Sequence, residues 1–248
     1  MSHTRTGWHF PLLFVVLTGC SAEPTSVQQP VASKPAETAS PSVTEPTPWN
    51  VNTLKDGEFA IEEGFRTLTF DDFEVFFAKP PKEGPATWQS IQDAIVCYGK
   101  PKGYIYSKET FKEFTLKLDF RFAPSKDELE SKSFNPNTGV LVFITPPHKQ
   151  WPKSLEVQGK FAELCSIKPN GGAAAVELQE DSAARDSARK PVGEWNEIEI
   201  IAKAGALTAK LNGTMICSSQ PGELTEGAIG LQSEDFEVHF RRLRIRTE

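Results

Sequence analysis

Two polar residues with complementary hydrogen-bonding chemistry lie two positions apart in the segment Ser154-Leu155-Glu156-Val157-Gln158. Alternation along a strand places Leu155 and Val157 on one face and Glu156 with Gln158 on the other. A carboxylate accepts hydrogen bonds and an amide both donates and accepts them, so the pair suits the hydroxyl groups of a sugar. Because an ordinary solvated sheet face shows the same alternation, the pair alone only nominates Glu156 and Gln158 as candidate site residues.

Several familiar catalytic and metal-binding patterns are missing from the sequence. It contains no GxSxG, no HExxH, no phosphate-binding glycine loop and no EF-hand loop. Outside the first nineteen residues the histidines are His148 and His239, which excludes a multi-histidine metal site. Apart from Cys20, the cysteines are Cys97, Cys165 and Cys217, and they do not have the spacing of metal ligands. The sequence leaves open whether two of them form a disulfide. We therefore predict no cofactor and leave the need for a divalent cation open.

The elements that must position these side chains are strands. In the segment 114–122, apolar residues alternate with polar ones, as in a half-buried strand. Asn212-Gly213 between two such runs is a hairpin signal, because both turn positions need positive φ. A short helix is predicted around 181–190. Similar alternation recurs at 65–77, 91–98, 138–145, 154–158, 174–179, 195–203, 206–211, 214–217, 227–232 and 236–246.

Many short strands with turn signals between them predict an all-β fold, a sandwich or jelly roll, over residues 59–248. Trp195 stands at the start of one of these strands, and we expect it to have a structural role rather than to bind sugar. The run 241–246 alternates arginine with apolar residues, which favours the solvent face of a final strand.

The N-terminal segment predicts export and lipid anchoring. The apolar run 10–17 is far shorter than the roughly 20 residues that span a bilayer, so residues 1–19 are interpreted as a signal peptide. Leu17-Thr18-Gly19-Cys20 resembles a bacterial lipobox, which implies cleavage before Cys20 and acylation of its thiol and amino group. Residues 20–50 are rich in Pro, Ser, Thr and Ala and predict a disordered tether. The expected location is the cell envelope, at the outer membrane or its periplasmic face.

The charge balance excludes one class of partner. The chain carries 27 basic and 33 acidic residues, a net charge of −6. Nucleic-acid binding requires neutralisation of phosphates by clustered cations, so we predict no nucleic-acid partner. Carbohydrate and, through the lipid anchor, the membrane are the expected partners.

From about Phe59 to Glu248 the chain resembles the 3-keto-disaccharide hydrolases, also described as 3-keto-glycoside lyase/hydratases. The resemblance lies in the joint order and spacing of short blocks. These are Gly64-Phe65, Gly103-Tyr104-Ile105-Tyr106-Ser107, the segment 114–122, Asn137-Thr138-Gly139-Val140, Leu155-Glu156-Val157-Gln158, Gly193-Glu194-Trp195-Asn196, Leu211-Asn212-Gly213, Gly230-Leu231-Gln232 and 238–245.

The resemblance implies a concanavalin-A-like jelly roll with a glycoside on its concave sheet. It also implies removal of the C2 hydrogen beside a C3 ketone, loss of the aglycone from C1, and hydration of the resulting 2-hydroxy-3-keto-glucal. On this hypothesis Glu156 is the general base or a ligand, Arg121 stabilises the enolate, and His239 is a further catalytic candidate. The expected substrate-binding residues are Gln158, Asn137, Gln232 and Glu234.

Two departures from the family pattern concern catalysis rather than fold. Family members often carry an arginine six residues after the asparagine of the Asn137 block, where this chain has Phe143. They also often carry His-Gly after the Gly-Leu-Gln block, where this chain has Ser233-Glu234. A non-catalytic carbohydrate-binding lipoprotein of the same fold is therefore the alternative hypothesis, and a purely structural envelope protein is the third.

Overall fold

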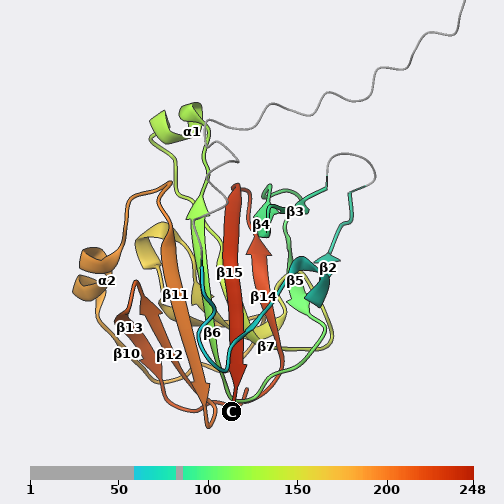
Figure 1. The fold of residues 1–248 in the computed structure, drawn as a ribbon, viewed down its shortest axis with the longest axis vertical. Helices are drawn as coiled ribbons and strands as arrows, with labels where there is room; N and C mark the ends of the chain where they lie inside the picture. Colours follow the sequence, from blue (N-terminus) through green and yellow to red (C-terminus); the bar gives the residue numbers. More distant parts are fainter. Residues whose placement is uncertain (1–58, 82–85) are drawn as a thin grey trace, which may run out of the picture. The chain divides into compact units, whose positions relative to one another are not determined.

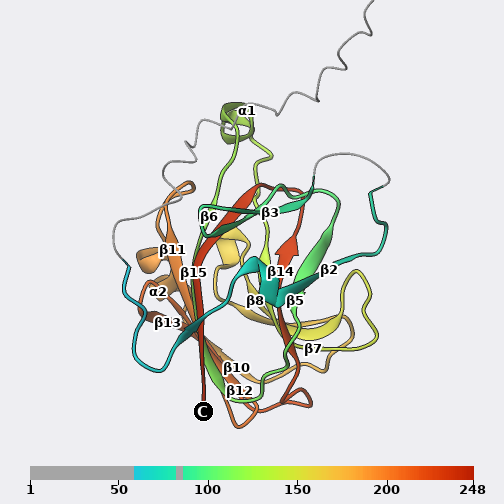
Figure 2. The same cartoon turned by 45° about the vertical axis from the view of Figure 1, so that its right-hand side comes forward.

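The computed structural model describes residues 59–81 and 86–248, which form two antiparallel β-sheets packed face to face (Figures 1 and 2). The prediction of an all-β sandwich is confirmed. The signal peptide, Cys20 and the tether predicted for residues 1–50 lie outside the described residues.

Sheet A has nine strands among the described residues, and β15 lies near its centre. Its path is β10 (Leu178–Glu180), β13 (Thr214–Ser219), β12 (Ala206–Leu211), β11 (Asn196–Lys203), β6 (Phe114–Phe122), β15 (Val238–Thr247), β4 (Ala94–Cys97) and β3 (Trp88–Ile91), and β1 (Arg66–Thr67) pairs with β15.

Sheet B has six strands within the same described ranges. Its path is β2 (Phe73–Phe77), β5 (Gly103–Ser107), β14 (Ala228–Ser233), β7 (Gly139–Thr145), β8 (Lys153–Gln158) and β9 (Ile167–Asn170). The short helical elements are α1 (Lys126–Glu130), α2 (Ser182–Ala188), η2 (Phe70–Asp72) and η3 (Phe161–Glu163).

The core lies between the two sheets and follows the predicted alternation. Strand β6 contributes its apolar residues to it, and β8 contributes Leu155 and Val157, which are at most 1% exposed. Burying apolar surface on the inner faces leaves the alternate residues of each strand on the outer faces. Glu156 and Gln158 therefore lie on the outer face of sheet B.

The predicted hairpin and helix are both present. Asn212 and Gly213 join β12 to β13 with φ of 49° and 82°. Helix α2 begins after Asp181, whose side chain accepts a hydrogen bond from the Ala184 amide at 2.9 Å.

Several elements differ from the predictions. The predicted run 65–77 is divided into β1, η2 and β2, and the run 174–179 is reduced to the edge strand β10. Strands β3, β5 and β9 and helix α1 were not predicted. Strand β9 contains Pro169, which lacks the N–H of a central strand and fits its edge position.

Candidate functional site

Glu156 shares the outer face of sheet B with residues from four other strands. It pairs with Leu141 on one side and Lys168 on the other, Leu141 pairs with Gly230, and Gly230 pairs with Tyr106. Residues directly opposite one another in antiparallel strands lie on the same face. We call this surface the site face, and define it by Tyr104, Tyr106, Gly139, Glu156, Gln158, Lys168, Gly230 and Gln232.

Glu156 is a buried carboxyl group with an unsatisfied oxygen. Glu156 is 8% exposed, and its Oε1 atom has no hydrogen-bond partner among the described residues. Burial, followed by repulsion from Glu234, raises the pKa of Glu156 from 4.5 to about 7, against the attraction of Lys168. A carboxyl group with such a pKa is well matched to proton transfer near neutral pH.

Gly139 explains how Glu156 and Gln232 come so close together. A Cβ atom at this position would lie 2.3 Å from Gln232 Oε1 and 2.5 Å from Glu156 Oε1, closer than any real contact. The two oxygens therefore converge over the glycine backbone. Gln232 Oε1 is also buried without a partner in the described chain, and a hydrogen bond from Gln232 partly offsets the rise in the pKa of Glu156, so the two side chains are in direct contact.

Asn137 and Glu234 form a second polar pair beside this point. Asn137 Nδ2 donates to Glu234 Oε2, and Asn137 Oδ1 is buried with no partner in the described chain. Thr138 Oγ1 donates to the Gln232 carbonyl at 2.9 Å, which ties the Asn137 loop to the end of β14. Burial raises the pKa of Glu234. Glu234 also repels the charged form of Glu156, which adds to the rise in the pKa of Glu156.

Gln158 lies on the site face but is already engaged. Its Oε1 accepts a hydrogen bond from the Lys160 amide at 2.8 Å, which shapes the turn after β8. Its amide nitrogen is the part of the side chain left to contact a ligand.

Lys168 is the cationic neighbour of Glu156 in the strand register. Its ammonium group pairs with Glu163, whose other carboxylate oxygen binds Lys160 Nζ at 2.9 Å. Hydrogen bonds from Lys160 and then Lys168 lower the pKa of Glu163 to about 2. Two cations therefore share one carboxylate beside the site face.

An aromatic cluster bounds the site face on β2 and β5. His148 stacks on Tyr106 with ring centroids 4.1 Å apart, and its Nδ1 lies 2.9 Å from the Tyr104 hydroxyl. Phe76 lies 5.1 Å from Tyr104, ring to ring. Burial lowers the pKa of His148, so the imidazole is neutral at pH 7. Tyr106 and Glu156 are three strands apart, about 14 Å between Cα atoms, with Gly230 in the row between them.

Arg121 and His239 were predicted as catalytic residues alongside Glu156, and the structure does not bring them together with it. They pair with each other on β6 and β15 of sheet A, between core-facing Phe120, Phe122, Val238 and Phe240. Alternation therefore turns them to the outer face of sheet A, on the other side of the sandwich from Glu156. Arg121 Nε lies 3.3 Å from His239 Nδ1, and His239 Nε2 lies 2.8 Å from Glu237.

Trp195 covers Arg121 and Arg241 on this face. Its ring lies 4.6 Å from Arg121 Cζ and 3.9 Å from Arg241 Cζ, and it packs against Ala94 and Val96 on β4. The indole thus spans the outer face of sheet A and lies away from the site face.

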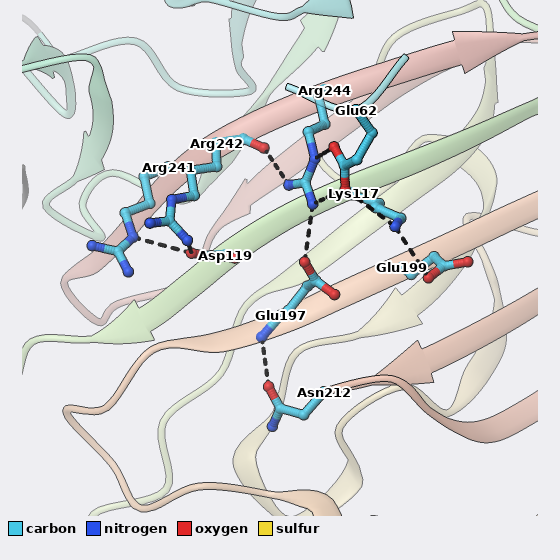
Figure 3. Close-up of polar contacts among 9 residues, drawn as sticks. All are labelled: Glu62, Lys117, Asp119, Glu197, Glu199, Asn212, Arg241, Arg242 and Arg244. Carbon is cyan, nitrogen blue, oxygen red and sulfur yellow. Dashed lines mark hydrogen bonds and ion pairs between the residues drawn. The ribbon is translucent and has the colours of Figure 1, made fainter. Parts of the chain in front are cut away.

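The rest of that outer face is a network of ion pairs (Figure 3). Arg241 and Arg242 both contact Asp119, at 3.1 and 3.3 Å. Arg244 lies between Glu62 at 2.6 Å and Glu197 at 3.0 Å. The arginine-rich face of β15 was predicted to face solvent; instead Arg241 and Arg244 are buried, at 7% and 2% exposed, and carboxylates largely neutralise them.

The N-terminal segment of the described chain runs across strands β6 and β15 of sheet A (Figure 1). Glu62 binds Arg244 and Lys117, and the Arg244 hydrogen bond does most to lower the pKa of Glu62 to about 2. Phe59 lies under Arg242, 4.3 Å from its Cζ. These contacts give the outer face of sheet A a structural role.

The structure adds little to the expectations on metals and thiols. Among residues 59–81 and 86–248, no group of three or more His, Cys, Asp or Glu side chains could hold a metal ion. Cys97, Cys165 and Cys217 are buried free thiols. No helix in these ranges is long and apolar enough to cross a membrane.

Five of the predicted site residues lie together at one end of the site face: Glu156, Gln158, Asn137, Gln232 and Glu234. Lys168 was not predicted, because no local sequence pattern marks it. Its position beside Glu156 comes from the β8–β9 register. The aromatic cluster was not predicted either. The alternating Tyr104 and Tyr106 were a usable signal, whereas His148 comes from a loop.

The comparisons with known proteins agree with this architecture. The family model described as the 3-keto-alpha-glucoside-1,2-lyase-like domain matches residues 64–246. Two solved structures from Parabacteroides distasonis ATCC 8503, both provisionally assigned as glycosyl hydrolases, resemble the chain. The first has a TM-score of 0.53 at 20% identity and covers 74% of this chain and 99% of its own. The second has a TM-score of 0.51 at 18% identity, with 75% and 94% covered. At these identities the likeness shows the fold alone. No curated protein matches the chain in sequence.

Proposed function

Because the chain belongs to the 3-keto-alpha-glucoside-1,2-lyase-like family, we propose that it cleaves 3-keto-glycosides on the site face, with Glu156 as the general base. One observation carries the proposal. Glu156 has a pKa of about 7 and an unpartnered oxygen that converges with that of Gln232. This arrangement supplies a base of suitable strength where sugar hydroxyls can be bound.

The reaction follows from the acidity of the C2 hydrogen beside a C3 ketone. Glu156 removes the C2 proton, and the C2–H electron pair forms an enolate with the C3 oxygen. Collapse of the enolate restores the ketone, forms the C1–C2 double bond and expels the aglycone with the C1–O electron pair. The aglycone oxygen takes up the proton that Glu156 removed, water then adds its hydroxyl to C1 and its hydrogen to C2, and the net change is hydrolysis.

The remaining polar groups of the site face serve recognition in this proposal. Gln232 Oε1 and Asn137 Oδ1 accept hydrogen bonds from substrate hydroxyls, since both are buried without partners in the described chain. Glu234 keeps the pKa of Glu156 high through repulsion and also orients Asn137. The half-exposed Tyr106 and His148 of the aromatic cluster, stacked on each other, offer apolar contact to the part of the substrate farther from Glu156.

Exchange at C2 tests the proposed base separately from bond cleavage. The purified domain is incubated in D₂O with a 3-keto-glycoside that carries a poor leaving group, and deuterium at C2 is followed by NMR. Wild-type protein is expected to accelerate the exchange, and Glu156→Gln is expected to abolish the acceleration. Saccharide binding without any exchange would instead establish the non-catalytic alternative.

We also propose that Cys20 anchors this domain to the cell envelope through attached lipid. The support is the lipobox-like tetrad at Cys20 and the composition of residues 20–50. Several acyl chains, each buried CH₂ contributing about 0.8 kcal/mol, hold a protein on a membrane without a spanning helix.

A further inference from the structure

The proposed elimination places a negative charge on the C3 oxygen, and the site face must stabilise it. This inference therefore rests on the proposed function. Neither of the two expected sources of positive charge can stabilise this oxygen. Arg121 lies on the outer face of sheet A, and position 143, where family members often carry arginine, holds Phe143 fully buried in the core.

Other lysines near the site face are less well placed than Lys168. Lys102 forms an ion pair with Asp235 at 2.6 Å and acts on Glu234 rather than on Glu156. Lys153 belongs to β8, but it alternates with Glu156, so it lies on the opposite face, and it pairs with Glu223 at 2.9 Å. Lys168 is the direct cross-strand neighbour of Glu156, on the same face.

We propose that Lys168 is a catalytic residue that stabilises the enolate oxygen formed when Glu156 removes the C2 proton, and that Glu163 positions it. Cβ atoms of directly opposed residues lie about 5 Å apart, so a lysine side chain easily reaches a substrate atom beside the Glu156 carboxylate. Its side chain is 43% exposed, so an incoming ligand can approach it.

The surroundings of Lys168 hold it without cancelling its charge. Glu163 binds Lys168 and Lys160, so the three side chains together carry a net charge of +1. The short helix that carries Glu163 is fixed in turn by Arg189. Arg189 donates to the Phe161 carbonyl at 2.8 Å and covers the Phe161 ring at 4.4 Å.

Charge and atoms balance in this step. The proton passes from C2 to Glu156, which becomes neutral, and the negative charge moves to the C3 oxygen beside the Lys168 ammonium. The ammonium keeps its protons and returns to Glu163 when the aglycone leaves. A preorganised donor at the site of developing charge typically contributes 10²–10³-fold to a rate.

The test compares Lys168→Met with Lys168→Arg and a matched control. Lys153→Met is the control, because Lys153 is also ion-paired on a neighbouring strand of the same sheet, with 39% of its side chain exposed. With a 3-keto-glycoside as substrate, Lys168→Met is expected to lower kcat roughly 10²-fold. Lys168→Arg should retain most of the rate, and Lys153→Met should match wild type.

The pH profile separates a catalytic from a structural effect. Lys168 opposes the rise in the pKa of Glu156, so its removal should move the acidic limb of kcat/KM to higher pH. Unchanged kcat in Lys168→Met, or an equal loss in Lys153→Met, would overturn the assignment of Lys168 while wild-type turnover upholds the proposed function. Absence of wild-type turnover overturns both.

Discussion

Glu156→Gln is expected to stabilise the protein, and to do so only at higher pH. The pKa of Glu156 in the folded state is about 7, compared with 4.5 as the ordinary value, because burial and Glu234 disfavour the charged form. A folded-state pKa above the unfolded one means that stability falls as pH rises between these values. The penalty is absent below about pH 4.5 and complete above about pH 7, where it amounts to about 3 kcal/mol. Glutamine keeps the shape of the neutral acid and removes the penalty.

The assay is thermal unfolding of wild type and variant at pH 4.5 and pH 8. Glu156→Gln should unfold at the wild-type temperature at pH 4.5 and roughly 6–12 °C higher at pH 8. Glu163→Gln is the matched control, because ion pairs lower the pKa of Glu163 to about 2. Its effect has the opposite sign, a loss of about 1 kcal/mol at pH 8. A Glu156→Gln variant that is equally stable or less stable than wild type at pH 8 would refute the assignment of Glu156 as a strained, functional carboxyl group.

Three further predictions concern other parts of the chain. Gly139→Ala should cost about 1–3 kcal/mol in urea unfolding and reduce turnover, because its Cβ would collide with Glu156 and Gln232; an unchanged midpoint would contradict the packing described. Trp195→Ala should lower stability by roughly 3 kcal/mol and leave saccharide binding intact, and the reverse pattern in melting and binding assays would give Trp195 a ligand role. Cys20→Ala should move the folded protein from the membrane to the soluble fraction, and sedimentation with salt-washed membranes would argue against the lipid anchor.

The fold could be predicted from sequence because its strands carry strong alternation. The segment 114–122 and the Asn212-Gly213 turn each specify local structure through side-chain period and positive φ. Strands such as β3 and β9 are short and gain their stability from neighbours in the sheet, so local pattern does not mark them. Strand β10 shows the converse, since only Leu178 and Gln179 of the alternating run 174–179 pair with β13.

Only those site residues that belong to a single strand or a single sequence block could be predicted. Glu156 and Gln158 follow from alternation within β8, whereas pairing between strands decides which other residues join them. Arg121 looked suitable by residue type, but the inner-face phenylalanines of β6 fix it on the outer face of sheet A. Lys168 looked unremarkable, yet the β8–β9 register puts it beside Glu156. Register is a tertiary property, and a single sequence does not reveal it.

Proton removal by Glu156 is tested by turnover of a 3-keto-glycoside by the wild-type domain and by Glu156→Gln at pH 7.5. Release of the aglycone and the appearance of 2-hydroxy-3-keto-glucal or its hydrate are followed by NMR or mass spectrometry. Wild-type turnover is expected to fall roughly 10²–10⁴-fold in Glu156→Gln, while the variant remains folded. Wild-type protein that binds the substrate without turning it over, or a variant as active as wild type, would contradict proton removal by Glu156.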